Sequence, residues 1–208
     1  MASTRFSLTT VFLISSLLSF GQIKKGTSAI GGNVGFSFQT DPNLSRFNFT
    51  LAPDLLFFVA KDFAIGPKIG YAVTTRKPKA VNTTDVSQAF FLGPVLRHYF
   101  KLSQMVYLYS GASAYYTTGK MTQLQSASDL SQVYNGVGWE VGPGLSIFPS
   151  KNVAIEIGPQ YRGSYITNAI KNNKVVVGNQ SSIVTHGVFF EVGFRYFFEK
   201  AEKESKPK

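Results

Sequence analysis

Charged residues that interrupt apolar segments are the part of this chain whose types and spacing could do chemistry. Four acids and four bases fall at alternate positions among apolar and small residues: Asp54, Lys68, Arg97, Glu140, Glu156, Arg162, Glu191 and Arg195. A charge removed from water is costly unless an opposite charge or several hydrogen bonds compensate it. The equal numbers of the two signs predict a network of buried ion pairs, and a conducting path or a bound small ligand are the alternatives.

Residues suited to catalysis or metal binding are sparse. The two histidines, His98 and His186, have no partner at the spacing of a metal site or a catalytic triad. The chain has no cysteine, which excludes thiolate metal sites and a disulfide scaffold. There is no glycine-rich phosphate-binding loop. The sequence therefore predicts no catalytic residue, no metal and no cofactor.

The charged residues must be positioned by β-strands, because the pattern around them has a period of two. In Gly187–Phe198, apolar residues alternate with a set that contains Glu191, Gly193 and Arg195. The same alternation recurs along the chain, in segments at least as long as the 9–11 residues that a tilted membrane strand needs. Eight strands are expected: Ala29–Phe38, Arg46–Val59, Phe63–Arg76, Ala89–Lys101, Met105–Thr117, Asn135–Phe148, Val153–Thr167 and Ser182–Phe198.

Short and long connections alternate between these strands. Residues 60–62, 102–104 and 149–152 form tight turns, whereas 77–88, 118–134 and 168–181 are longer and polar, and 39–45 is a short exception among the second set. Outer-membrane barrels have short periplasmic turns and longer external loops. The sequence thus predicts an all-β fold, an eight-stranded antiparallel up-and-down transmembrane β-barrel, with both termini in the periplasm.

Each predicted strand has one face for lipid and one for the interior. The unbroken apolar face is expected to meet lipid, and the face with glycines and charges is expected to fill the narrow lumen of an eight-stranded barrel. Aromatic residues near the two strand ends predict two interfacial belts. One belt comprises Phe57, Phe58, Phe63, Tyr99, Phe100, Tyr107 and Tyr196–Phe198, and the other Phe38, Phe47, Phe90, Tyr115, Tyr116, Trp139 and Tyr165.

Prolines inside the predicted strands do not fit a regular ladder, because proline has no N–H to donate. They are Pro53, Pro67, Pro94, Pro143 and Pro159, and four of them directly follow glycine. Bulges or bends at one level of the barrel are expected there.

The chain divides into three parts. Residues 1–21 have a charged start, an apolar stretch too short to span a bilayer, and small residues Ser19 and Gly21 before a cleavage site, which predicts a signal peptide. Residues 22–198 form the barrel, and 199–208 a charged periplasmic tail. The net charge is +10, but the bases are scattered and no nucleic-acid motif is present, so an anionic lipid surface is expected rather than nucleic acid.

Residues 23–198 resemble the small outer-membrane β-barrels of Gram-negative bacteria, the OmpA/OmpX type. The most specific element is the segment Glu191–Phe198, with a polar residue, a glycine and two aromatics at set spacing. The resemblance implies that the barrel-assembly machinery reads Glu191, Gly193, Tyr196 and Phe198 as an insertion signal. The tail after Phe198 departs from family members that end on the aromatic, and it is too short for a peptidoglycan-binding domain.

The expected function is that of a non-enzymatic, monomeric outer-membrane protein with a packed, ion-paired lumen and external loops for surface interaction or envelope integrity. A narrow porin of the same fold and a secreted lipocalin-like lipid carrier are the alternatives. A lipid-modifying enzyme is a further class. It is disfavoured because His186 is followed by Gly187 and Val188, whereas barrels that resemble the lipid A deacylases use a His with a Ser two residues on.

Overall fold

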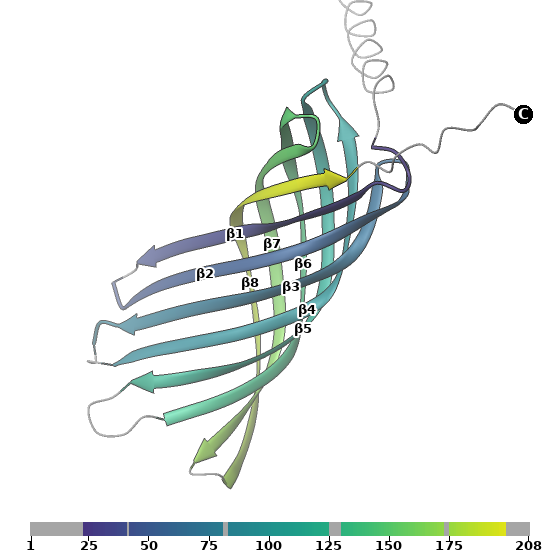
Figure 1. Ribbon diagram of the computed structural model, residues 1–208. Coiled ribbons are helices and arrows are strands. Elements are labelled where there is room, and N and C mark those ends of the chain that lie inside the picture. The colour runs from purple at the N-terminus through teal and green to yellow at the C-terminus, as the bar shows by residue number, and fades with distance from the viewer. Residues whose placement is uncertain (1–22, 41, 81–82, 125–129, 173–174, 199–208) are drawn as a thin grey trace, which may run out of the picture.

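The computed structural model of the 208-residue chain describes residues 23–40, 42–80, 83–124, 130–172 and 175–198. Within these residues the chain forms eight antiparallel strands, each hydrogen-bonded to the next, and they close into one barrel (Figure 1). The strands are β1 (Ser28–Thr40), β2 (Leu44–Ala60), β3 (Phe63–Pro78), β4 (Thr84–Lys101), β5 (Val106–Leu124), β6 (Leu130–Ser150), β7 (Val153–Asn172) and β8 (Val175–Phe198). The predicted barrel is confirmed, and the predicted signal peptide and tail lie outside the described residues.

Pairing between β1 and β8 closes the barrel. The ladder runs from Ser28 opposite Phe198 to Gly35 opposite Glu191. The start of β1 and the end of β8 lie at the same end of the barrel as the tight turns after β2, β4 and β6 (Figure 1). The connections therefore sort by end, as the sequence predicts for an even number of strands.

The strands are longer than the sequence pattern indicates. Most of residues 77–88, 118–134 and 168–181, which were expected in connections, continue the ladders instead: β5 extends to Leu124 and β8 begins at Val175. In this part of β5 the outward positions are polar at Thr118, Lys120 and Thr122, and the last one, Leu124, is apolar. A strand that has left the hydrocarbon keeps its hydrogen bonds but no longer needs an apolar face, so hydrophobic periodicity does not reveal it.

An apolar belt surrounds the barrel. Large apolar side chains point outward and are exposed, as Phe36 and Phe190 illustrate at 70% each. The belt runs from Phe63 to Val73 on β3 and from Val106 to Tyr116 on β5, about the 9–11 residues that a membrane strand needs. Next beyond it, outward positions are polar: Thr40, Ser45, Thr75, Gln88, Thr118, Asn135 and Thr167. A lipocalin-like carrier would need this apolar face inside, so the structure excludes that alternative.

Proline-containing strands keep their register, and the predicted bulges are wrong. Pro67 lies opposite Pro94 in the β3–β4 ladder, and the β4–β5 register is the same at Leu92 as at Val95. The register shifts that do occur lie elsewhere, at residues 58–60, 147–150 and 168–170.

The close packing of neighbouring strands explains why glycine precedes these prolines. A Cβ on Gly66 would overlap the carbonyl oxygen of Leu55, and one on Gly142 would overlap that of Pro159. The neighbouring backbone therefore approaches too closely for any other residue, as happens where a sheet bends sharply. Glycine is therefore required at these positions for steric reasons, and the prolines that follow cause no shift of register.

Candidate functional site

The lumen holds two clusters of charged side chains. The lower cluster is the one nearer the end with the tight turns, and the upper cluster lies further along the barrel axis. The lower cluster is centred on Arg195 of β8, which is 0% exposed. Its guanidinium binds Asp54 of β2, with one Nη2–Oδ2 distance of 3.0 Å, and Glu156 of β7, with 3.1 Å between Nε and Oε1. Arg97 of β4 completes the ring, because its Nη1 lies 2.5 Å from Glu156 and its Nη2 lies 3.5 Å from Asp54.

Neutral side chains add further hydrogen bonds to one carboxylate oxygen of the lower cluster. The hydroxyls of Ser146 and Tyr99 donate to Oε1 of Glu156 over 2.9 and 3.2 Å. The Arg97 guanidinium also lies over the ring of Tyr109, 4.7 Å from its centroid. The cluster has two acids and two bases, so it is electrically neutral and well supplied with hydrogen bonds.

The upper cluster is centred on Arg162 of β7. Its Nε donates to Glu140 of β6 over 2.8 Å, and its Nη2 donates to Glu191 of β8. Lys68 of β3 binds the other oxygen of Glu140 at 2.5 Å, and the amide of Asn33 donates to Glu191 over 2.7 Å. This cluster also balances two acids against two bases.

Together the clusters contain all eight charged residues that the sequence places inside the barrel. Glu191 and Arg195 lie four residues apart on β8, and they bind different clusters rather than each other. The eight side chains come from β2, β3, β4, β6, β7 and β8, so the network ties together strands that do not pair.

Aromatic rings fill the lumen below the lower cluster, at the end with the tight turns. Phe58, Tyr99 and Phe197 are nearly fully buried, with ring centroids 5.6–6.4 Å apart. Phe148 extends this group toward Tyr107, with centroid distances of 5.1 Å to both Phe197 and Tyr107. These rings, called the aromatic plug below, close the lumen at this end.

The aromatic plug corrects part of the predicted belts. The sequence places Phe58, Tyr99, Tyr107 and Phe197 in a lipid-facing belt, but all four are buried and point inward. Tyr115 also points into the lumen, where its ring lies 4.9 Å from that of Phe91. Other members of the belts, such as Phe57, Phe100, Phe90 and Trp139, are exposed on the outer face.

The segment before β1 covers the plugged end. The N–H of Gly26 donates to the carbonyl of Phe58 over 2.8 Å, and the N–H of Ile23 donates to the Asp62 carboxylate over 2.8 Å. Asp62 adopts a left-handed φ of 59° in the tight turn after β2. Burial raises the pKa of this carboxyl, although the Ile23 N–H opposes the change.

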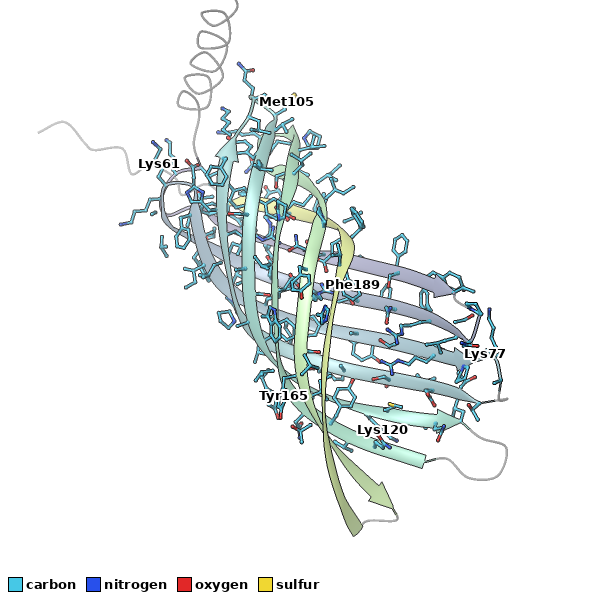
Figure 2. The ribbon with its side chains drawn as sticks, turned by 180° about the vertical axis from the view of Figure 1, so that it is seen from behind. Lys61, Lys77, Met105, Lys120, Tyr165 and Phe189 are labelled. Carbon is cyan, nitrogen blue, oxygen red and sulfur yellow. The ribbon has the colours of Figure 1, made fainter. Side chains whose placement is uncertain are left out.

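A cavity of about 300 Å³ lies on the other side of the two clusters. Arg162 and Phe189 contribute to its inner end. Its walls carry Asn48, Thr74, Ser87 and Tyr134, and a row of Arg46, Arg76 and Asp85 lies further out, from β2, β3 and β4. Lys77 and Lys120 lie toward this end of the barrel, opposite Lys61 and Met105 (Figure 2).

Arg46, Arg76 and Asp85 were not among the predicted site residues. Asp85 was assigned to a connection, and the two arginines stood at predicted strand ends. The strand phase could have found the arginines, because Arg46 shares the phase of Asp54 and Arg76 that of Lys68.

The four residues of the expected insertion signal divide between the two faces of β8. Glu191 and Gly193 point inward, and a Cβ on Gly193 would overlap Oδ1 of Asn33. Tyr196 and Phe198 point outward, with ring centroids 4.8 Å apart. Glu191 and Gly193 therefore also have a structural role in the folded barrel.

Within the described ranges, no group of His, Asp and Glu side chains could hold a metal ion. No helix in the described part of the chain is long and apolar enough to cross a membrane.

Comparison with known proteins places the fold. No protein-family model matches the chain, and no curated protein matches it. Among solved structures, the outer membrane protein OprG from Pseudomonas aeruginosa aligns with a TM-score of 0.55 and 13% identity, over 85% of this chain and 98% of that chain. Neisserial surface protein A aligns at 0.49 and 18%, over 85% and 99%. The N-terminal β-barrel domain of OprF from P. aeruginosa aligns at 0.47 and 11%, over 85% and 100%.

At these identities the likeness concerns the fold alone. The closed ladder of eight antiparallel strands and the outward apolar belt agree with it. The chain has the fold of the eight-stranded outer-membrane β-barrels.

Proposed function

We propose that this protein is a non-enzymatic, monomeric barrel of the outer membrane with a closed lumen, which contributes to envelope integrity and presents its outer strand ends to surfaces or partners. The proposal is supported by the middle of the lumen, where the charged side chains are paired and electrically neutral. Eight charges form two closed clusters, and the aromatic plug lies below them. A lumen filled by side chains serves to hold the barrel rigid rather than to pass solutes.

The exposed belt supports the proposed location. A soluble protein rarely exposes a contiguous apolar patch of more than a few hundred Å², whereas here apolar side chains are exposed on every strand from β1 to β8. Both chain termini are proposed to lie in the periplasm, because the tight turns of outer-membrane barrels lie there.

Strand ends beyond the belt provide the proposed contact surface. The expected long loops are largely β-hairpins, since β5 and β6 continue to Leu124 and from Leu130. A rigid hairpin presents side chains to a partner at a lower entropy cost than a mobile loop does.

The proposed assembly partner is the barrel-assembly machinery, which would read Glu191, Gly193, Tyr196 and Phe198. Tyr196 and Phe198 offer the more specific test, because their rings face outward and fill no space in the lumen. Replacing both by leucine keeps an apolar belt, and it is expected to lower membrane insertion in cells but not refolding in detergent. Equal insertion in cells would argue against the signal.

Fractionation tests the proposed location and form. The full chain expressed in a Gram-negative host is expected in the outer-membrane fraction, to require detergent for extraction, and to migrate faster on gels when it is not boiled. Recovery as a soluble protein, with or without a change in migration on boiling, would refute the proposal.

A narrow channel is the second candidate, and the cavity of about 300 Å³ favours it. Solute passage would then require the clusters and the aromatic plug to rearrange. Swelling of liposomes that contain the protein, in an isosmotic solution of a small sugar, would support the channel. An unchanged light-scattering trace is the result that the closed lumen predicts.

A further inference from the structure

The row of Arg46, Arg76 and Asp85 differs from every other charged group in the lumen. Its three residues are neighbours in register, because Arg46 lies opposite Arg76 and Arg76 opposite Asp85. Cross-strand neighbours have Cβ atoms about 4.5–5.5 Å apart. All three line the cavity. The row carries a net charge of +1, from two bases and one acid, whereas both clusters below it are neutral.

Polar atoms in this row lack partners. Nε of Arg46 and Oδ1 of Asp85 are buried without a hydrogen bond. Among the described residues, neither arginine forms an ion pair with a carboxylate. An unpaired buried polar atom is costly, and native structures leave few of them. A ligand that supplies an acceptor to the arginines and a donor to Asp85 would satisfy this row.

The polar groups next to this row are, in contrast, already satisfied by one another. Thr74 donates to Asn48 over 2.8 Å, and the amide of Asn48 donates to Ser37 over 2.8 Å. The hydroxyls of Ser87 and Tyr134 lie 2.8 Å apart. Asn33, His98 and Ser113 also have a buried atom without a partner, but none of them lines the cavity. Among the described residues that do line it, the buried atoms without a partner belong to the charged row, and a ligand would sit there.

From this juxtaposition we propose that the outer end of the lumen binds a small organic anion. Its carboxylate or phosphate lies between Arg46 and Arg76, and a hydroxyl or amino group on the same molecule donates to Asp85. Arginine binds both kinds of anion through paired N–H donors. The cavity of about 300 Å³ is at the small end of the usual range for ligand sites, roughly 300–1,000 Å³, so the ligand is small.

The ligand is a free solute rather than a lipid headgroup. Arg46 and Arg76 line the cavity, and the exposed Lys77 beside Arg76 has the opposite strand phase and faces outward. Figure 2 shows Lys77 at the end of β3 away from Lys61. Lipid phosphate around the barrel would meet Lys77, whereas a solute in the lumen would meet the arginines. The site lies beyond the two clusters, so it does not depend on whether the lumen conducts.

Calorimetric titration of the refolded full chain in an uncharged detergent at low salt tests the site. Glycerol 3-phosphate is the probe that has both an anion and donors, and inorganic phosphate and glycerol are the comparisons. Glycerol 3-phosphate is expected to bind more tightly than phosphate, and glycerol is expected not to bind. Arg46→Met and Arg76→Met should each weaken the binding of glycerol 3-phosphate by about tenfold or more, because each removes a charge-assisted hydrogen bond.

Two further variants distinguish specific binding at the site from non-specific electrostatic attraction of anions to the basic protein. Lys77→Met makes the same change of charge one residue away on the outer face, and it should alter binding by less than twofold. Asp85→Ala should abolish the preference for glycerol 3-phosphate over phosphate. Folding of each variant is checked by its migration with and without boiling.

The proposal is overturned if the wild-type chain binds none of the anions, if folded Arg46→Met and Arg76→Met bind as the wild type does, or if Lys77→Met weakens binding as much as they do. The last result would assign the anion to the outer surface and to lipid phosphate. None of these results would bear on the closed lumen, which is tested by solute passage.

Discussion

At the scale of single residues, Arg195 organises the lower half of the lumen. It is fully buried and it binds both Asp54 and Glu156, which come from strands on either side of the barrel closure. Removing one partner of a buried ion pair is strongly destabilising, because the buried acid that loses its base remains as an uncompensated charge.

Arg195→Met is therefore expected to lower the free energy of unfolding by about 3–5 kcal/mol, because Arg97 alone would face two buried acids. Urea titration of the refolded protein in detergent micelles, followed by tryptophan fluorescence or circular dichroism, measures the change.

Two companion variants give the control. Lys61→Met removes the same charge at an exposed turn and should change stability by less than about 0.5 kcal/mol. Adding Glu156→Gln to Arg195→Met should recover part of the loss, because one of the two acids becomes neutral. A midpoint for Arg195→Met equal to that of the wild type would show that the pairs do not stabilise the barrel.

At the scale of the strands, the apolar belt defines where each strand meets lipid. Val141 and Asn135 both point outward from β6 and are exposed, but Val141 lies within the belt and Asn135 just beyond it. The same substitution should therefore have very different effects at the two positions.

Val141→Arg is expected to destabilise the barrel in bilayers by about 2–4 kcal/mol, while Asn135→Arg should cost about 0–1 kcal/mol. Refolding into vesicles at a series of urea concentrations measures both. Equal costs at the two positions would contradict the position of the belt edge.

The hairpin of β5 and β6 beyond the belt should be dispensable for folding. Gly119 pairs with Tyr134, so residues 120–133 can be replaced by an Asn-Gly turn that joins the two. The shortened chain is expected to refold and to keep its difference in gel migration on boiling. Loss of folding would show that the outer ladder, and not the belt and lumen, directs assembly.

The sequence predicts the parts of the structure on which the bilayer imposes an apolar period of two. The strand segments that face lipid can be predicted, because nearly every second residue in them is apolar. Examples are Phe63–Val73 and Val106–Tyr116. Thr118 to Leu124 are strand as well, but water accepts polar and apolar side chains alike, so no period appears. Lys68 and Glu140 have the inward strand phase, which the sequence shows. Their ion pair depends on the barrel's radius and on the offset between strands, which no single strand encodes.

Some aromatic residues were wrongly assigned to the lipid-facing belts because their position along the strand was considered without the strand phase. Phe57 and Phe58 are adjacent and chemically identical, yet one faces lipid and the other fills the aromatic plug. Proximity to the strand end suggested one belt for both, and only the strict phase of two separates them. Arg46, Arg76 and Asp85 were missed because their grouping needs the register of three strands.

At the scale of the whole molecule, the lumen changes character along the axis. It has an aromatic plug at the end with the tight turns, then two neutral clusters, then a cavity with an excess of positive charge. This order is the basis for the proposals that the barrel is closed at one end and binds a small anion at the other. We propose that no continuous water path joins the two ends.

Planar-bilayer recording of the wild-type protein shows whether such a water path exists. The protein is added as refolded barrels whose folding is verified by gel migration, with the boiled sample as the control and a potential applied in both directions in molar potassium chloride. The paired clusters and the aromatic plug predict a silent membrane, without discrete current steps. Reproducible steps of uniform size from the folded sample, absent from the boiled one, would contradict the closed lumen.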